Sequence, residues 1–220
     1  MRAVFLLALS LLCVASEPLA AAQTYELLFR STALKDLEAA TGETTIVYER
    51  VVSGADTVEV GGNDSIDLKI ISGGNVTMTL HRGGRSRGLG DYPASVGNPL
   101  IMYFLESILA DIANQSGGSP YYLRNRIKEA LLRDARIMRV SLRHQNADIR
   151  AREVTIRPFR NDKARERMGR FSELALTVTV SEDIPGWYYS LAATVPAASG
   201  GNEGGYSNAI TFKAAGEEPR

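Results

Sequence analysis

Apolar residues recur at two different periods along the chain, helical in the middle and strand-like on either side. After Asn98 and Pro99, which suit a helix start, helical spacing places six large apolar residues on one face: Ile101, Phe104, Leu105, Ile108, Leu109 and Ile112. A second helix begins at Ser119 and Pro120, and its apolar stripe is Leu123, Ile127, Ala130 and Leu131. Charged residues lie off both stripes, so the pattern predicts a helical hairpin that covers a sheet and does not span a membrane.

Two stretches before the helices have the pattern of strands. Residues 44–52 are rich in β-branched side chains, which favour a strand. In residues 65–80, apolar residues alternate at period two on both sides of a Gly-Gly turn: Ile66, Leu68 and Ile70 before it, and Val76, Met78 and Leu80 after it. This second stretch predicts a β-hairpin.

Residues 82–98 connect this hairpin to the helices and are rich in glycine and arginine. Such a connection is longer than most loops in compact domains, and long loops tend to be functional or disordered. The sequence leaves open which of the two applies. The candidate functional residues of this loop are Arg82, Arg85, Ser86 and Arg87.

The C-terminal part reads as five strands in about eighty residues, with a Pro185-Gly186 corner before an aromatic strand. This pattern resembles a small immunoglobulin-like β-sandwich, a likeness of fold that implies no function. The predicted fold class is therefore α+β, mainly antiparallel β with a central helical hairpin. We expect a signal peptide at 1–22, an N-terminal hairpin and two-helix region at 23–134, a sandwich-like region at 135–216, and a disordered tail at 217–220.

The N-terminal residues have the pattern of a secretory signal peptide. Arg2 precedes an apolar run over residues 3–15, and Ala20 and Ala22 fit the small-residue rule for cleavage after Ala22. The run is too short to span a bilayer. Cys13, the only cysteine, would leave with the leader, so a mature chain would lack disulfides and thiol chemistry. We expect a bacterial protein that is periplasmic or secreted; an uncleaved anchor is the alternative.

Charge is segregated along a chain whose formal net charge is zero. Residues 124–170 hold 15 basic and 6 acidic residues, so this segment carries a net charge of +9. Arg139, Arg143 and Arg157 alternate with apolar positions, and we expect them on one exposed face that suits an anionic lipid surface or another envelope protein. The alternatives are pairing with acidic strands of the same molecule and an ordinary solvated face.

Catalytic and metal signatures are weak. The pattern around Ser86 matches the G-x-S-x-G of serine hydrolases, but no helix follows directly, and a triad with Asp134 and His144 has to fit into about sixty residues. His81 and His144 lack the spacing of zinc ligands, and the surroundings of Asp64 and Asp67 lack that of a calcium loop. We predict no catalytic residue, no metal and no cofactor.

Three hypotheses of function follow. The first is a non-enzymatic binding or scaffolding protein of the bacterial envelope. The second is a carrier of a lipid or other apolar ligand with the helix pair as its lid, which requires a continuous cavity lined by Ile101, Phe104 and Ile108. The third is a serine hydrolase that uses Ser86. Export and neutral overall charge disfavour nucleic acid as a partner.

Overall fold

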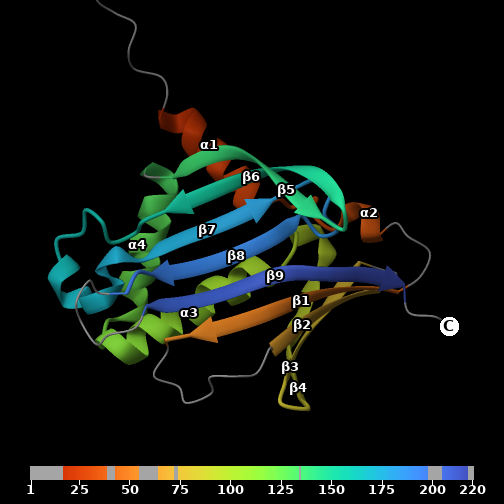
Figure 1. The fold of residues 1–220 in the computed structure, drawn as a ribbon, viewed down its shortest axis with the longest axis horizontal. Coiled ribbons are helices and arrows are strands. Elements are labelled where there is room, and N and C mark those ends of the chain that lie inside the picture. Colours follow the sequence, from red (N-terminus) through yellow and green to blue (C-terminus); the bar gives the residue numbers. More distant parts are fainter. Residues whose placement is uncertain are drawn as a thin grey trace, which may run out of the picture.

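The computed structural model describes residues 17–38, 43–54, 64–71, 74–133, 135–197 and 205–217. Residues 1–16 of the expected signal peptide and residues 218–220 of the expected C-terminal tail lie outside these ranges. The fold is α+β, as predicted: one large antiparallel sheet whose one side is covered by helices (Figure 1).

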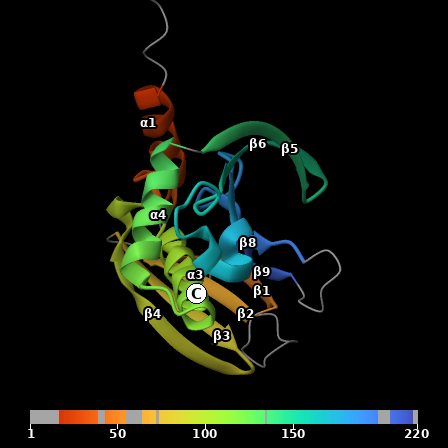
Figure 2. The same ribbon diagram turned by 90° about the vertical axis from the view of Figure 1, so that its left-hand side faces the viewer.

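The sheet has nine strands in the order β4-β3-β2-β1-β9-β8-β7-β6-β5. Their bounds are β1 Thr44–Ser53, β2 Asp64–Ile71, β3 Asn75–Arg82, β4 Arg85–Pro93, β5 Arg136–His144, β6 Ala147–Ile156, β7 Ala175–Val180, β8 Tyr188–Val195 and β9 Tyr206–Glu217. Both halves are meanders, and the last strand, β9, pairs with β1 to join them. Figure 2 shows the sheet curving around the helices, with the β5–β6 hairpin arching away from them.

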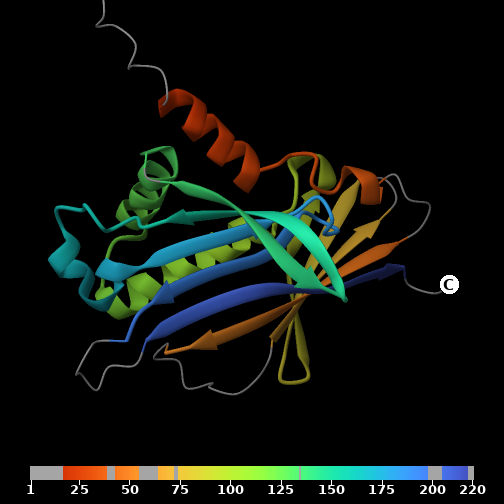
Figure 3. The ribbon, with the colours of Figure 1, turned by 45° about the horizontal axis from the view of Figure 1, so that its top comes forward.

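The helices are α1 Glu17–Leu28, α2 Lys35–Glu38, α3 Leu100–Ser116 and α4 Pro120–Arg133, with 3₁₀ segments at Ala94–Val96 and Arg165–Glu173. The hairpin of α3 and α4 is confirmed, and Gly117 ends α3 in the left-handed conformation. Five of the six predicted α3 stripe residues are buried, with Leu105 packed at the margin of the core. Figure 3 shows α1 lying beside α4 at one edge of the helix layer.

Asn98 joins the helix layer to two distant parts of the sheet. Its Oδ1 accepts a hydrogen bond from Leu100 N at 3.0 Å, as expected for a residue that begins a helix. Its Nδ2 donates to Gly186 O at 2.8 Å and to Tyr48 Oη at 3.3 Å. This buried amide therefore fixes the start of α3 against β1 and the β7–β8 corner.

The immunoglobulin-like sandwich is not confirmed. All five C-terminal strands exist, but they continue the same sheet as β1–β4 and do not form a second layer opposite them. The apolar sides of β6, β7, β8 and β9 pack against the helices, and this contact supplies the burial that a second sheet supplies in a sandwich.

The prediction of a long loop over residues 82–98 is wrong. Residues 85–93 form strand β4, which pairs with β3 after a tight turn at Gly83 and Gly84, both at positive φ. Most β4 residues are exposed, and three of its nine are glycine or proline, so neither apolar alternation nor composition marked it as a strand. At this edge of the sheet, pairing with β3 decides the structure.

Candidate functional site

Four arginines share one face of the β5–β6 hairpin, and we call them the arginine face: Arg139, Arg143, Arg150 and Arg152. The register places Arg139 directly opposite Arg152, Ser141 opposite Arg150, and Arg143 opposite Asp148. Among the described residues, none of these four arginines forms an ion pair within 4.0 Å, and all but the half-buried Arg152 are exposed. Although Asp148 lies opposite Arg143, the four arginines outnumber it, so the hairpin presents concentrated positive charge.

Arg157, the third arginine of the predicted row, does not belong to this face. It follows Ile156, the last residue of β6, whose side chain is buried beneath the helices. Because successive side chains alternate across a strand, Arg157 points to the opposite side. Sequence alternation alone missed Arg150 and Arg152, which complete the face.

A tryptophan connects the arginine face to the end of α1. The guanidinium carbon of Arg152 lies 5.8 Å from the Trp187 ring centroid, and that of Arg30 lies 4.2 Å from it. Both are cation–π distances. Arg30 also forms an ion pair with the exposed Glu182 at 3.2 Å. Trp187 is buried and donates from Nε1 to Leu27 O at 2.8 Å, so it also holds the end of α1 in place.

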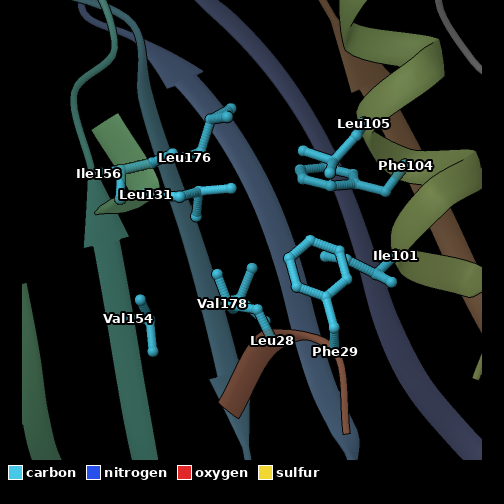
Figure 4. Close-up of a pocket in the computed structure, with 10 residues that line it drawn as sticks. All are labelled: Leu28, Phe29, Ile101, Phe104, Leu105, Leu131, Val154, Ile156, Leu176 and Val178. Atoms are coloured by element: carbon cyan, nitrogen blue, oxygen red, sulfur yellow. The ribbon is translucent and has the colours of Figure 1, made fainter. Parts of the chain in front are cut away.

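An apolar seam lies where the helices meet the edge of the sheet, beside the arginine face. Its lining is apolar throughout (Figure 4): Leu28, Phe29, Ile101, Phe104, Leu105, Leu131, Val154, Ile156, Leu176 and Val178. The enclosed volume is about 10 Å³, room for about one water molecule. Among the described residues, the void beside Ile101 and Phe104 is therefore not the continuous cavity expected for a carrier, and Ile108 does not line it.

The seam and the arginine face lie on the same side of β6. Side chains two residues apart along a strand point the same way, so Ile156, Val154, Arg152 and Arg150 form one row. The row changes from apolar to basic between Val154 and Arg152, whose Cα atoms are about 7 Å apart. The cross-strand partners change in step, because Ile137 lies opposite Val154 and Arg139 lies opposite Arg152.

The predicted loop residues lie around the tip of the β3–β4 hairpin and are split between the two sides of the sheet. Arg82, Arg85 and Arg87 alternate with Ser86, which points to the other side. Arg82 binds the buried Asp64 with Nη2 at 2.5 Å from Oδ2, and Arg50 binds the same oxygen at 3.2 Å. Asp64 thus links β1, β2 and β3 through its two arginine partners. The polar residues around it in the sequence did not indicate this structural role.

Ser86 is hydrogen-bonded to His81, which in turn is hydrogen-bonded to Asp67. Its Oγ lies 2.8 Å from His81 Nδ1, and His81 Nε2 lies 3.1 Å from Asp67 Oδ2. His144, the histidine of the triad considered in the sequence, is not part of this hydrogen-bonded group and packs its ring against Phe212, with 5.3 Å between the ring centroids. This hydrogen-bonded group lies on the exposed side of strands β2, β3 and β4. The described residues around it show neither a pocket nor hydrogen-bond donors directed at a substrate oxygen, which a hydrolase site needs.

Three buried tyrosines have strongly shifted acidities. Burial raises the pKa of Tyr48 and of Tyr188 above the usual value of 10.0. Burial also raises the pKa of Tyr206, and its hydrogen bond to Asp111, at 2.6 Å, adds to that effect. Each hydroxyl is a structural donor or acceptor between elements. Within the described ranges, no group of three or more histidine, cysteine, aspartate or glutamate residues is arranged to hold a metal ion.

No protein-family model matches this chain, and no curated protein matches it. Among solved structures, the chain is similar to lipoprotein LppX of Mycobacterium tuberculosis over 93% of its own length and 98% of the other, at 10% identity and a TM-score of 0.33. It is also similar to a putative outer membrane lipoprotein-sorting protein domain from Vibrio parahaemolyticus over 90% and 93%, at 10% identity and a TM-score of 0.19. These scores are too low to transfer a function.

Proposed function

We propose that this protein is an exported, non-enzymatic binding protein of the bacterial envelope that attaches to an anionic lipid surface through the arginine face. The observation that carries the proposal is the direct cross-strand pair of Arg139 and Arg152. Like charges directly opposite each other destabilise a sheet. A phosphate placed between two guanidinium groups removes that repulsion and receives their forked hydrogen bonds.

The alternative of internal neutralisation finds no support in the contacts of the described residues. Two acidic side chains elsewhere pair with other arginines, Glu106 with Arg124 and Glu173 with Arg165. Near an anionic bilayer each basic residue contributes about 1 kcal/mol, so the four arginines together contribute about 4 kcal/mol. This attraction falls with salt, because exposed charges are screened.

Export rests on the leader pattern and agrees with the packing of α1. The described residues of α1 that are buried, Thr24, Leu27 and Leu28, all follow the expected cleavage site at Ala22. Cleavage there removes none of these contacts. In addition, no helix among the described residues has both the length and the apolar character needed to cross a membrane. Sequencing the N-terminus of the native protein tests the proposal: a start at Gln23 supports it, and a start at Met1 contradicts it.

Binding to vesicles tests the lipid interaction. Vesicles of phosphatidylglycerol should retain the protein at low salt, and vesicles of phosphatidylcholine should not. Replacing Arg139 and Arg150 by Ser should weaken retention about tenfold or more, since two contributions of about 1 kcal/mol are lost. The matched control replaces Arg136 and Arg157, two exposed arginines off this face, and should bind as the unmodified protein does. Equal losses in both variants, or retention independent of salt, would contradict a specific arginine face.

A further inference from the structure

We infer that the apolar seam is an acyl-chain site for the lipid whose anionic headgroup the arginine face binds. This inference rests on the proposed function and adds the ligand class: a lipid with a long aliphatic chain and an acidic headgroup. The change from Val154 to Arg152 along one side of β6 matches the change from chain to headgroup in such a molecule. The charge of the neighbouring face thus selects an anionic amphiphile over a neutral apolar ligand.

The chemistry of the lining favours an aliphatic occupant. The ten residues around the void contribute no charged, hydroxyl or amide side chain, so a polar ligand would lose its hydrogen bonds to water without replacement. Eight of them come from α3, α4, β6 and β7, and the other two lie at the end of α1; Figure 4 shows them converging from these separate elements. The void between these elements becomes larger when one of them moves away from the others.

The segment that closes the seam is the end of α1. Leu28 and Phe29 line the void and follow the expected new N-terminus by only a few residues. Besides packing on α4, this segment is held by two side-chain hydrogen bonds to its backbone, from Trp187 Nε1 to Leu27 O at 2.8 Å and from Tyr188 Oη to Leu28 O at 2.5 Å. The remaining lining residues belong to longer helices and to the sheet.

Occupation of the site therefore requires displacement of Leu28 and Phe29. The void of about 10 Å³ admits no aliphatic chain while both side chains are in place. A bound chain takes over the apolar surface that these two side chains cover, so the segment and the lipid compete for one place. The apparent affinity for lipid is then reduced by the fraction of molecules in which the segment covers the seam.

Binding of cis-parinaric acid, an anionic fatty acid that fluoresces in dry apolar surroundings, tests the inference on the full mature chain. Replacing Leu28 and Phe29 by Ala should tighten its binding by about tenfold, because the competing side chains are removed. The matched control is Leu132→Ala, which removes an exposed leucine of α4 that does not line the void. The control should leave the affinity unchanged.

A second variant, Leu176→Trp, fills the seam from the sheet side and should abolish binding of the fatty acid; circular dichroism establishes that it is folded. Absence of fatty-acid binding, or equal affinities in the Leu28/Phe29 variant and the Leu132 control, overturns the acyl-chain site. If phosphatidylglycerol vesicles still retain the protein through Arg139 and Arg150 in that case, the proposed function stands without it. Loss of both activities overturns the two proposals together.

Discussion

Arg139 and Arg152 lie directly opposite each other on β5 and β6, and no carboxylate of the described residues forms an ion pair with either. On the same face, the next pair toward the hairpin tip that carries two charges is Arg143 with Asp148, of opposite sign. The hairpin therefore contains a repulsive pair and an attractive pair in nearly the same setting, and these two pairs can be compared directly.

Arg139→Thr should stabilise the protein at low salt by about 0.2–1 kcal/mol, because it removes the like-charge pair. Arg143→Thr, the matched control, should be neutral or destabilising by a similar amount. Urea denaturation measures both changes. Phosphate should stabilise the unmodified protein more than chloride does at equal ionic strength, and this difference should disappear in Arg139→Thr. A loss of stability in Arg139→Thr would show that the repulsion is compensated.

Asn98→Ala should destabilise the protein by about 2–3 kcal/mol. The substitution removes the side-chain cap of α3, which contributes about 1 kcal/mol, and it also removes the buried hydrogen bonds that Asn98 donates to Gly186 O and Tyr48 Oη. Urea denaturation measures the effect. Asn161→Ala changes an exposed asparagine and should stay within about 0.5 kcal/mol of the unmodified protein. Similar values for the two variants would show that the bonds of Asn98 are not needed.

Stability should decrease as the pH rises above about 10. Tyr48, Tyr188 and Tyr206 have pKa values above their ordinary one in the folded protein because burial disfavours the phenolate. Their contribution is complete below the pKa of the unfolded chain and is lost above it, because only the unfolded chain then releases these protons. Absorbance at about 295 nm measures the titration. Ionisation of all nine tyrosines in the folded protein near pH 10 would contradict the burial of these three.

Ser86→Ala should leave any hydrolysis of activated esters by the purified protein unchanged. The chain from Ser86 through His81 to Asp67 has the distances of a nucleophile and its base, but it lies exposed on the sheet. A hydrolase also needs donors aimed at the developing oxyanion and a site that excludes water. A decrease in ester hydrolysis specific to Ser86→Ala and His81→Ala would establish a hydrolase and contradict the proposed function.

Sequence patterns predicted those helices and strands that bury one face at a regular spacing of residues. The apolar stripes identified α3 and α4. Period-two alternation identified the β2–β3 hairpin with its buried Ile66 and Val76. Strand β4 was missed because most of its residues are exposed on both sides, so no apolar alternation exists to be read.

The candidate site could be predicted only in part. Sequence alternation correctly placed Arg139 and Arg143 on one exposed face of β5. It misplaced Arg157 because alternation within one strand does not give the register between two strands, and a slip of one residue exchanges the faces. The apolar seam could not be predicted from the sequence either, because its lining residues, such as Leu28 and Val178, are far apart in sequence and meet only in the folded chain.

The sequence by itself determined the local elements, the class of fold and the concentration of arginine in one segment, because each depends on neighbouring residues and their periodicity. Only the tertiary structure decided that β9 pairs with β1 to make one sheet, that Arg152 lies opposite Arg139, and that the end of α1 closes the seam. These relations depend on strand order and register, which arise from packing across the whole core and not from any single stretch of the chain.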